Sequence, residues 1–145
     1  MNIVSLPENK QLEKRLAITP EITKKYIDLG FTLFLPNNYG SHLGFDDKDY
    51  KILGVNFLDS EKDIIDKADI IIQLGIPEDK NLLLLKENQT LVGSLNFFSN
   101  KEKLDNLKSK KINCFSLELL PRITRAQSMD ILSSQANLAG YKAVV

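Results

Sequence analysis

The sequence lacks the residues that several kinds of site require. It has one cysteine, Cys114, and one histidine, His42. A single cysteine cannot form an internal disulfide, and with so few sulfur and imidazole ligands we expect no bound metal. The serines have no second histidine to serve as a base, which argues against a nucleophilic triad. Because Cys114 lies in an apolar run, we expect it to be a small buried hydrophobe.

Charge and hydropathy exclude two further classes of partner. The 19 basic and 19 acidic side chains cancel, so no long-range field attracts nucleic acid or anionic lipid. The longest apolar stretches, at residues 70–72 and 82–85, are too short to span a bilayer. The first residues have neither the basic nor the apolar region of a signal peptide. We therefore expect a chain of cytosolic character with no nucleic-acid partner and no direct membrane insertion.

The seven glycines are also informative through their spacing. They form neither the G-x-G-x-x-G pattern nor the Walker A spacing. A dinucleotide is usually anchored by a glycine-rich turn that places its pyrophosphate at a helix N-terminus. We therefore expect no such phosphate-binding loop within these residues.

What the sequence does contain is an alternation of short β-branched runs and charged helical segments, which predicts an α/β fold. Segment 68–74 is apolar on both faces, as expected for a central parallel strand. We predict a parallel sheet flanked by helices, Rossmann-like or flavodoxin-like. The expected strands are 2–6, 31–35, 55–58, 68–74, 90–95 and 112–117. The expected helices are 20–29, 47–53, 60–67, 81–87 and 101–109.

Two helices have clear boundary signals. Thr19 and Pro20 predict the N-cap and first position of one helix, and Gly30 predicts its end. Its apolar face is expected to be Ile22, Tyr26, Ile27 and Leu29. From about Gln127 to Val145 the pattern is a long helix with no stop signal. We therefore expect residues 1–126 to be the first domain of a two-domain protein and 127–145 to be a connector helix.

The junction between the last strand and this helix is unusually polar, and ligands bind at strand C-termini in open α/β sheets. Arg122 can grip a carboxamide or phosphate oxygen, and Asp130 can orient it or accept an N–H. A purely structural interpretation is also open. In that case Thr124 or Ser128 caps the helix, Arg125 lies on a solvated face and Asp130 lies near the positive helix start.

The run Pro-Arg-x-x-Arg-Ala-Gln-Ser-Met-Asp-x-Leu-Ser-Ser-Gln, from residue 121, closely resembles a motif of the alpha subunit of proton-translocating NAD(P) transhydrogenases. The resemblance implies that Arg122, Gln127, Asp130 and Ser133 are the catalytic and cofactor-binding residues, at the nicotinamide end of NAD(H). It also implies that Gln127 reaches toward the nicotinamide ribose of NADP(H) on a partner component. Holding two rings in contact requires fixed polar groups rather than a nucleophile.

Segment 13–20 resembles a Glu-x-Arg-Val-Ala-x-Thr-Pro box shared by transhydrogenases and alanine dehydrogenases, and 44–54 resembles their shared loop and helix. Within it, Arg15 has either a catalytic role or an ion pair with Glu13 or another acid. His42 is expected to face solvent. The segment Pro7-Glu8-Asn9 departs from Pro-Lys/Arg-Glu, which leaves its role open.

Two other departures separate the members of this superfamily. Alanine dehydrogenases have a lysine in a Lys-Glu-Pro turn and a histidine after the following strand. Gly75 and Asn96 stand at these places here, and neither supplies a cation or carries a proton near neutral pH. Hydride exchange between two nucleotides is thus favoured. An alanine- or saccharopine-type dehydrogenase, and a non-catalytic binding domain of the same fold, remain alternatives.

For the whole enzyme, the resemblance implies hydride transfer from NADH to NADP⁺ coupled to proton translocation. NAD(H) is expected on the complete component, in a Rossmann domain absent from these residues, and NADP(H) on a partner component. The soluble component is expected to form a homodimer and to associate with NADP-binding and membrane-spanning components. It would be cytoplasmic, peripheral to the inner (plasma) membrane, and the 145 residues are expected to be inactive alone.

Overall fold

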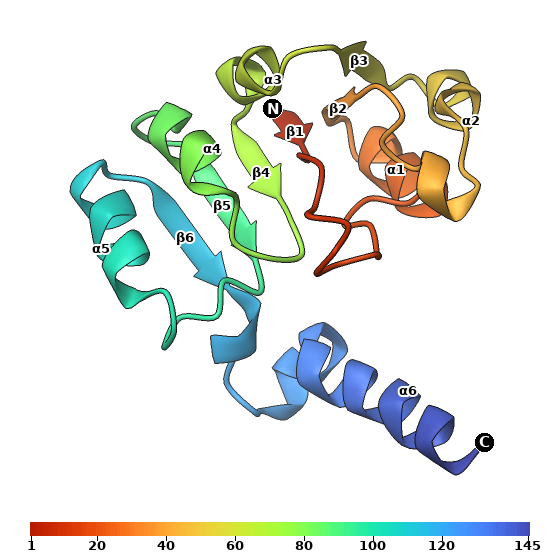
Figure 1. Cartoon of the computed structure of the whole chain (residues 1–145), viewed down its shortest axis with the longest axis vertical. Helices are drawn as coiled ribbons and strands as arrows, with labels where there is room; N and C mark the ends of the chain where they lie inside the picture. The colour runs from red at the N-terminus through yellow and green to blue at the C-terminus, as the bar shows by residue number, and fades with distance from the viewer.

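Six short parallel strands form the centre of the molecule, in the order β3-β2-β1-β4-β5-β6 (Figure 1). The computed structural model describes all residues, 1–145. The predicted parallel α/β architecture is confirmed, and the segment predicted as a central strand lies beside β1 in the middle of the sheet. The strands are β1 Asn2–Val4, β2 Thr32–Pro36, β3 Asn56–Leu58, β4 Ile70–Ile72, β5 Thr90–Gly93 and β6 Asn113–Ser116.

Helices cover both faces of this sheet. They are α1 Pro20–Asp28, α2 Asp47–Ile52, α3 Glu61–Lys67, α4 Asp79–Leu84, α5 Lys101–Ser109 and α6 Ile131–Val144, with short 3-10 turns η1 Ser41–Leu43, η2 Leu117–Leu119 and η3 Thr124–Met129. None of the helices combines the length and apolar character that a membrane crossing needs. The Leu-rich helix begins at Asp79 rather than Asn81. The last helix begins at Ile131 rather than near Gln127, because Asp130 caps it.

Alternate strand residues face two separate apolar cores. Val4 faces a core built with α3, α4 and α5, whereas its neighbour Ile3 faces a second core built with α1 and α2. The larger core includes Leu6, Ile64, Ile71, Leu91 and Leu107, and the smaller includes Leu33, Leu35, Tyr39, Tyr50 and Val55. This two-sided burial explains why the central strands have near-continuous apolar sequences.

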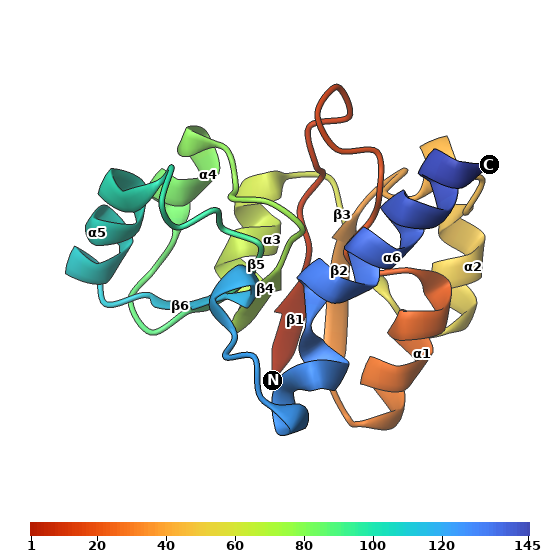
Figure 2. The ribbon, with the colours of Figure 1, turned by 90° about the horizontal axis from the view of Figure 1, so that it is seen from below.

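On the face that carries α1 and α2, the sheet is left uncovered over β4, β5 and β6. Figure 2 shows no helix beneath these strands, although α1 lies under the other half of the sheet. Ile72, Val92 and Phe115 are neighbours in register there, and Phe115 is 59% exposed. The expectation that Cys114 is buried is wrong: it is exposed, because β6 is an edge strand.

The predicted ends of α1 are confirmed. The Thr19 hydroxyl accepts a hydrogen bond from the Ile22 N–H at 3.4 Å, and Gly30 has a φ of +85° after the last turn. The predicted apolar face is wrong at one position, since Leu29 is 72% exposed and the small Thr23 is buried instead. The sheet offers space for a small side chain where α1 approaches it most closely.

Two tyrosines fix the end of the loop that follows β1. The Tyr39 hydroxyl accepts a hydrogen bond from the Ile18 N–H at 3.3 Å, and the Tyr50 hydroxyl donates one to the Ile18 carbonyl at 3.1 Å. Tyr39 also shares a hydrogen bond of 2.8 Å with Ser5. All four residues are buried. The backbone at Ile18 is therefore tied directly to the smaller core.

Gly93 provides a test of how tightly the carboxyl ends of β4 and β5 approach. A Cβ at this position would lie 2.3 Å from the Gln73 carbonyl oxygen, a backbone atom that cannot turn aside. We expect Gly93→Ala to lower the free energy of unfolding by about 2–3 kcal/mol, the range typical of overpacking. Urea denaturation followed by circular dichroism measures this change.

Gly75→Ala is the matched control. A Cβ there would meet only Glu8 Oε2, at 3.8 Å, which is an ordinary contact. We expect this variant to change stability by less than about 0.5 kcal/mol, as for substitutions without a steric cause. Equal effects of the two substitutions would contradict the close approach inferred at Gly93.

Candidate functional site

All six strands end at the same edge of the sheet, and the polar segments that follow them gather there. The order of the strands reverses between β1 and β4, which is the point where open α/β sheets commonly receive ligands. Figure 1 shows α6 beyond the arrowheads of β4, β5 and β6, at this same edge. The candidate site is therefore sought among the segments that follow the strands.

A pocket of about 450 Å³ is formed by the segment between η2 and α6 together with the first turns of α6. The four residues predicted as site residues, Arg122, Gln127, Asp130 and Ser133, all line it. The other lining residues are Pro121, Ile123, Thr124, Ala126, Leu132 and Ala136. The structure thus brings together the four side chains that the sequence motif singled out.

Asp130 has a structural task in this pocket. One carboxylate oxygen accepts hydrogen bonds from the Leu132 N–H at 3.0 Å and the Ser133 N–H at 3.1 Å. The other accepts from the Ser133 hydroxyl at 2.6 Å. The Ser133 hydroxyl, then its backbone N–H and, more weakly, the charge of Arg122 lower the pKa of Asp130 below its ordinary value. The structural interpretation named Thr124 or Ser128 as the cap, and that assignment is wrong.

Arg122 and Gln127 are exposed, whereas Ala126 between them is buried. The buried methyl group holds the η3 turn against the protein, and the Ala126 N–H donates to the Ile123 carbonyl at 2.9 Å. The guanidinium and the carboxamide therefore extend from a fixed turn into a pocket open to solvent. Arg125 is also exposed but does not line this pocket.

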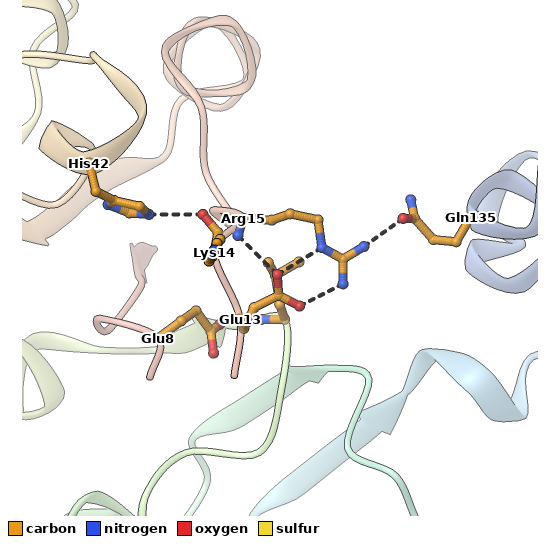
Figure 3. Close-up of polar contacts among 7 residues, drawn as sticks. Glu8, Glu13, Lys14, Arg15, His42 and Gln135 are labelled. Atoms are coloured by element: carbon orange, nitrogen blue, oxygen red, sulfur yellow. Dashed lines mark hydrogen bonds and ion pairs between the residues drawn. The ribbon is translucent and has the colours of Figure 1, made fainter. Parts of the chain in front are cut away.

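A second polar cluster lies near the first, around Arg15 (Figure 3). Its Nε and Nη2 atoms donate to the two carboxylate oxygens of Glu13, at 2.9 and 2.6 Å. Its Nη1 atom donates to the Gln135 side-chain oxygen on α6 at 2.6 Å. The ion pair considered for Arg15 is therefore present. The contact with Gln135 could not be predicted from sequence, because the two residues are far apart along the chain.

Two further contacts hold the loop after β1 (Figure 3). His42 is exposed as predicted, and its Nε2 atom lies 2.9 Å from the Lys14 carbonyl oxygen. Glu8 Oε1 accepts a hydrogen bond from the Leu74 N–H at 2.6 Å. Burial raises the pKa of Glu8 above its ordinary value, although hydrogen bonds from Leu74 and Gly75 oppose this shift. Glu8 thereby joins the β1 and β4 loops where the strand order reverses.

The positions that separate transhydrogenases from alanine dehydrogenases follow neighbouring strands. Gly75 follows β4 and Asn96 follows β5. Asn96 is exposed, has a φ of +49° and accepts hydrogen bonds from Ser99 and Asn100 through its backbone carbonyl. These two strand ends thus present neither a cation nor an imidazole. No group of three His, Cys, Asp or Glu side chains is placed to hold a metal ion.

Comparison with known proteins extends these observations. The family model "Alanine dehydrogenase/PNT, N-terminal domain" matches residues 5–139. The whole chain is 38% identical to the first segment of NAD(P) transhydrogenase subunit alpha of Rickettsia prowazekii and spans 39% of that protein. The structure of a transhydrogenase from Sinorhizobium meliloti superposes with a TM-score of 0.87 at 32% identity, covering 97% of this chain and 42% of the other.

An L-alanine dehydrogenase structure superposes with a TM-score of 0.75 at 24% identity, covering 81% of this chain and 32% of the other. That likeness shows a shared fold. The chain therefore spans less than half the length of each of these relatives.

The ion pair between Glu13 and Arg15 predicts a specific pH dependence. Hydrogen bonds from Arg15 lower the pKa of Glu13 to about 2. Because the folded-state pKa is the lower one, the pair stabilises the fold above the unfolded pKa of about 4.3. That contribution is lost as the pH falls toward about 2. Since Arg15 is 57% exposed, we expect Glu13→Gln to cost no more than about 1 kcal/mol at neutral pH.

Urea unfolding of both proteins across the acidic range measures this difference, which should disappear near the lower pKa. Glu21→Gln is the matched control, because Glu21 pairs with Lys25 on an exposed helix surface. It should show a smaller effect at neutral pH. A Glu13→Gln difference that persists unchanged in acid would rule out an ionic origin.

Proposed function

This chain belongs to the alanine dehydrogenase/PNT N-terminal domain family, and we propose that it forms the first domain of the NAD(H)-binding component of a proton-translocating NAD(P) transhydrogenase. The observation that carries this proposal is the pocket at the end of β6, where Arg122, Gln127, Asp130 and Ser133 line one cavity. The full-length match to a transhydrogenase component supports it. The activity belongs to the whole enzyme, of which this chain supplies one portion.

The pocket suits the nicotinamide end of NAD(H) in size and in polar groups. Its volume of about 450 Å³ lies in the range of about 300–1,000 Å³ typical of ligand sites. Arg122 offers donors for a carboxamide oxygen, whereas Gln127 and Asp130 offer acceptors for its N–H groups. When bound, NADH supplies the hydride. The side chains orient the ring, and none of them needs to act as a nucleophile or a base.

Asp130 can serve this purpose and cap α6 at the same time. A carboxylate has about four lone-pair positions, and three are used by Leu132 and Ser133. The cap fixes both oxygens relative to the helix, so a remaining lone pair points in a defined direction. Its lowered pKa keeps the group charged and able to accept an N–H. Fixed groups of this kind reduce the entropy lost in aligning two reactants.

The amino-acid dehydrogenase alternative is disfavoured by the strand ends after β4 and β5. Reduction of a keto acid needs a cation for the carboxylate and a proton carrier for the carbonyl. Gly75 and Asn96 provide neither. Near Gly75 the structure instead places the Glu8 carboxylate, whose charge would repel an anionic substrate.

For the complete protein we propose residues 1–126 as the first domain and 127–145 as the connector to a Rossmann domain that binds NAD(H). The exposed apolar surface of β4, β5 and β6, including Phe115, supports a further segment packing on this face. NADP(H) would bind a partner component, and the soluble component would form a homodimer. Partner subunits would place it at the cytoplasmic side of the inner membrane.

The roles of the loop residues predict a separation between rate and affinity. In the full-length protein with its NADP-binding partner, Arg122→Ala, Gln127→Asn and Asp130→Asn should each slow hydride transfer, by up to about a hundredfold. NADH binding should weaken by only about 0.5–1.5 kcal/mol, the usual loss for one polar contact. Asn is itself a good N-cap residue, so Asp130→Asn removes the charge while keeping the cap.

Stopped-flow hydride transfer and equilibrium NADH titration measure these two effects. Arg125→Ala is the matched control, because Arg125 is exposed on the same turn but lies outside the pocket. It should transfer hydride at the wild-type rate. If the three loop variants did the same, the loop would be only a helix start.

A second prediction concerns substrate class. The full-length protein should oxidise NADH only at trace rates in the presence of pyruvate and ammonium, because Gly75 and Asn96 lack the required chemistry. The measurement is absorbance of NADH under saturating substrates. Turnover near ~10 per second, the median for enzymes, would instead assign the chain to the amino-acid dehydrogenases.

A further inference from the structure

Helix α6 forms one wall of the pocket, yet apolar burial does not hold it in place. Leu132, Ser133 and Ala136 of α6 line the cavity, but no residue of the helix is buried. Figures 1 and 2 show α6 extending away from the sheet along most of its length. Its contact with the protein body is mainly with the short η2 turn. Some other interaction must therefore set the orientation of α6.

The hydrogen bond from Arg15 Nη1 to the Gln135 side-chain oxygen, at 2.6 Å, is that interaction. It is the one side-chain hydrogen bond between α6 and the sheet with its surrounding loops. Figure 3 shows Arg15 between the loop after β1 and α6, with its guanidinium facing Gln135. Gln135 lies one turn into the helix, next to the residues that line the pocket.

Arg15 can orient a helix because its own position is fixed. Both carboxylate oxygens of Glu13 accept from the other guanidinium nitrogens, which sets the plane of the group. Beyond Arg15, Ile18 is held by Tyr39 and Tyr50 in the smaller core. Before it, the Lys14 carbonyl contacts His42. The guanidinium is thus connected to the sheet through anchored backbone on both sides.

We propose that Arg15 is a positioning residue for hydride transfer: through Gln135 it sets the rotation of α6 and thereby the placement of Asp130 and Ser133 in the pocket. The inference rests on the proposed function of that pocket. A rotation of α6 by about 10° moves a group about 5 Å from the helix axis by about 1 Å. A displacement of this size can cost about a hundredfold in rate.

The first experiment uses the full-length protein with its NADP-binding partner. Arg15→Met and Gln135→Leu each remove the hydrogen bond, and each should slow hydride transfer by about ten- to a hundredfold. The dissociation constant for NADH should change by less than about twofold, because neither side chain lines the pocket. The double variant should be no slower than the slower single variant, as expected for two residues that act through one contact.

Two matched variants separate positioning from general damage. Gln135→Glu keeps an acceptor for Arg15 and should recover most of the rate lost in Gln135→Leu. Asn137→Leu makes a comparable amide-to-leucine change at another exposed position of α6 and should transfer hydride at the wild-type rate. Equal slowing in Asn137→Leu, or NADH affinity that falls in parallel with the rate, would overturn the proposal.

A second experiment reads the orientation of α6 without catalysis. Spin labels on cysteines at Leu12 and Leu138, which are 86% and 62% exposed, report the distance between the β1 loop and the helix. Cys114, which is exposed, is first replaced by serine. Arg15→Met should broaden the distance distribution, and Asn137→Leu should leave it narrow.

The two experiments distinguish the possible failures. If Arg15→Met leaves the distance distribution narrow, Arg15 does not hold α6 and the proposal is wrong. If the distribution broadens while hydride transfer keeps its rate, the contact exists but does not position the loop, and the proposal is again wrong. If the wild-type protein and its partner transfer no hydride, the proposed function fails, whereas the spin-label distances still decide whether Arg15 orients the helix.

Discussion

The common direction of the six strands determines where every candidate functional side chain lies. Because all six are parallel, each strand delivers the residues that follow it to the same edge of the sheet. At the reversal of strand order, Glu8 already occupies the backbone N–H of Leu74. The chain thus fills with its own carboxylate the place where such sheets often bind an anionic ligand. The larger polar pocket forms farther along the edge, after β6.

This displacement has a consequence for how the pocket is held. A site after the edge strand cannot be enclosed by neighbouring strand loops, and α6 gains no buried residue there. Its geometry rests on polar contacts, namely the Asp130 cap and the bond between Arg15 and Gln135. Each such contact has a net value of about 0.5–1.5 kcal/mol, far less than a packed apolar interface. A ligand or partner with comparable interaction energy can therefore shift the helix.

Local signals in the sequence were enough for most of the fold. The cap at Thr19 and the positive-φ glycine Gly30 depend on a few adjacent residues, and both were predicted. The exposure of Cys114 was not predictable, because an apolar run reads the same in an edge strand as in a central one. The start of α6 was misplaced because several residues in 124–130 can cap a helix, and the chain selects Asp130.

The site divides along the same line. A contiguous motif was sufficient to name Arg122, Gln127, Asp130 and Ser133, since residues close in sequence can meet in one pocket. The partner of Arg15 depended on the fold, because α6 must return across the carboxyl edge before Gln135 can reach it. Asp130 shows that the structural and functional interpretations of the motif are compatible. The hydrogen bonds that make it a cap are the same ones that orient its carboxylate. A side chain already fixed by the backbone loses little further entropy when it contacts a ligand, so capping favours a positioning role.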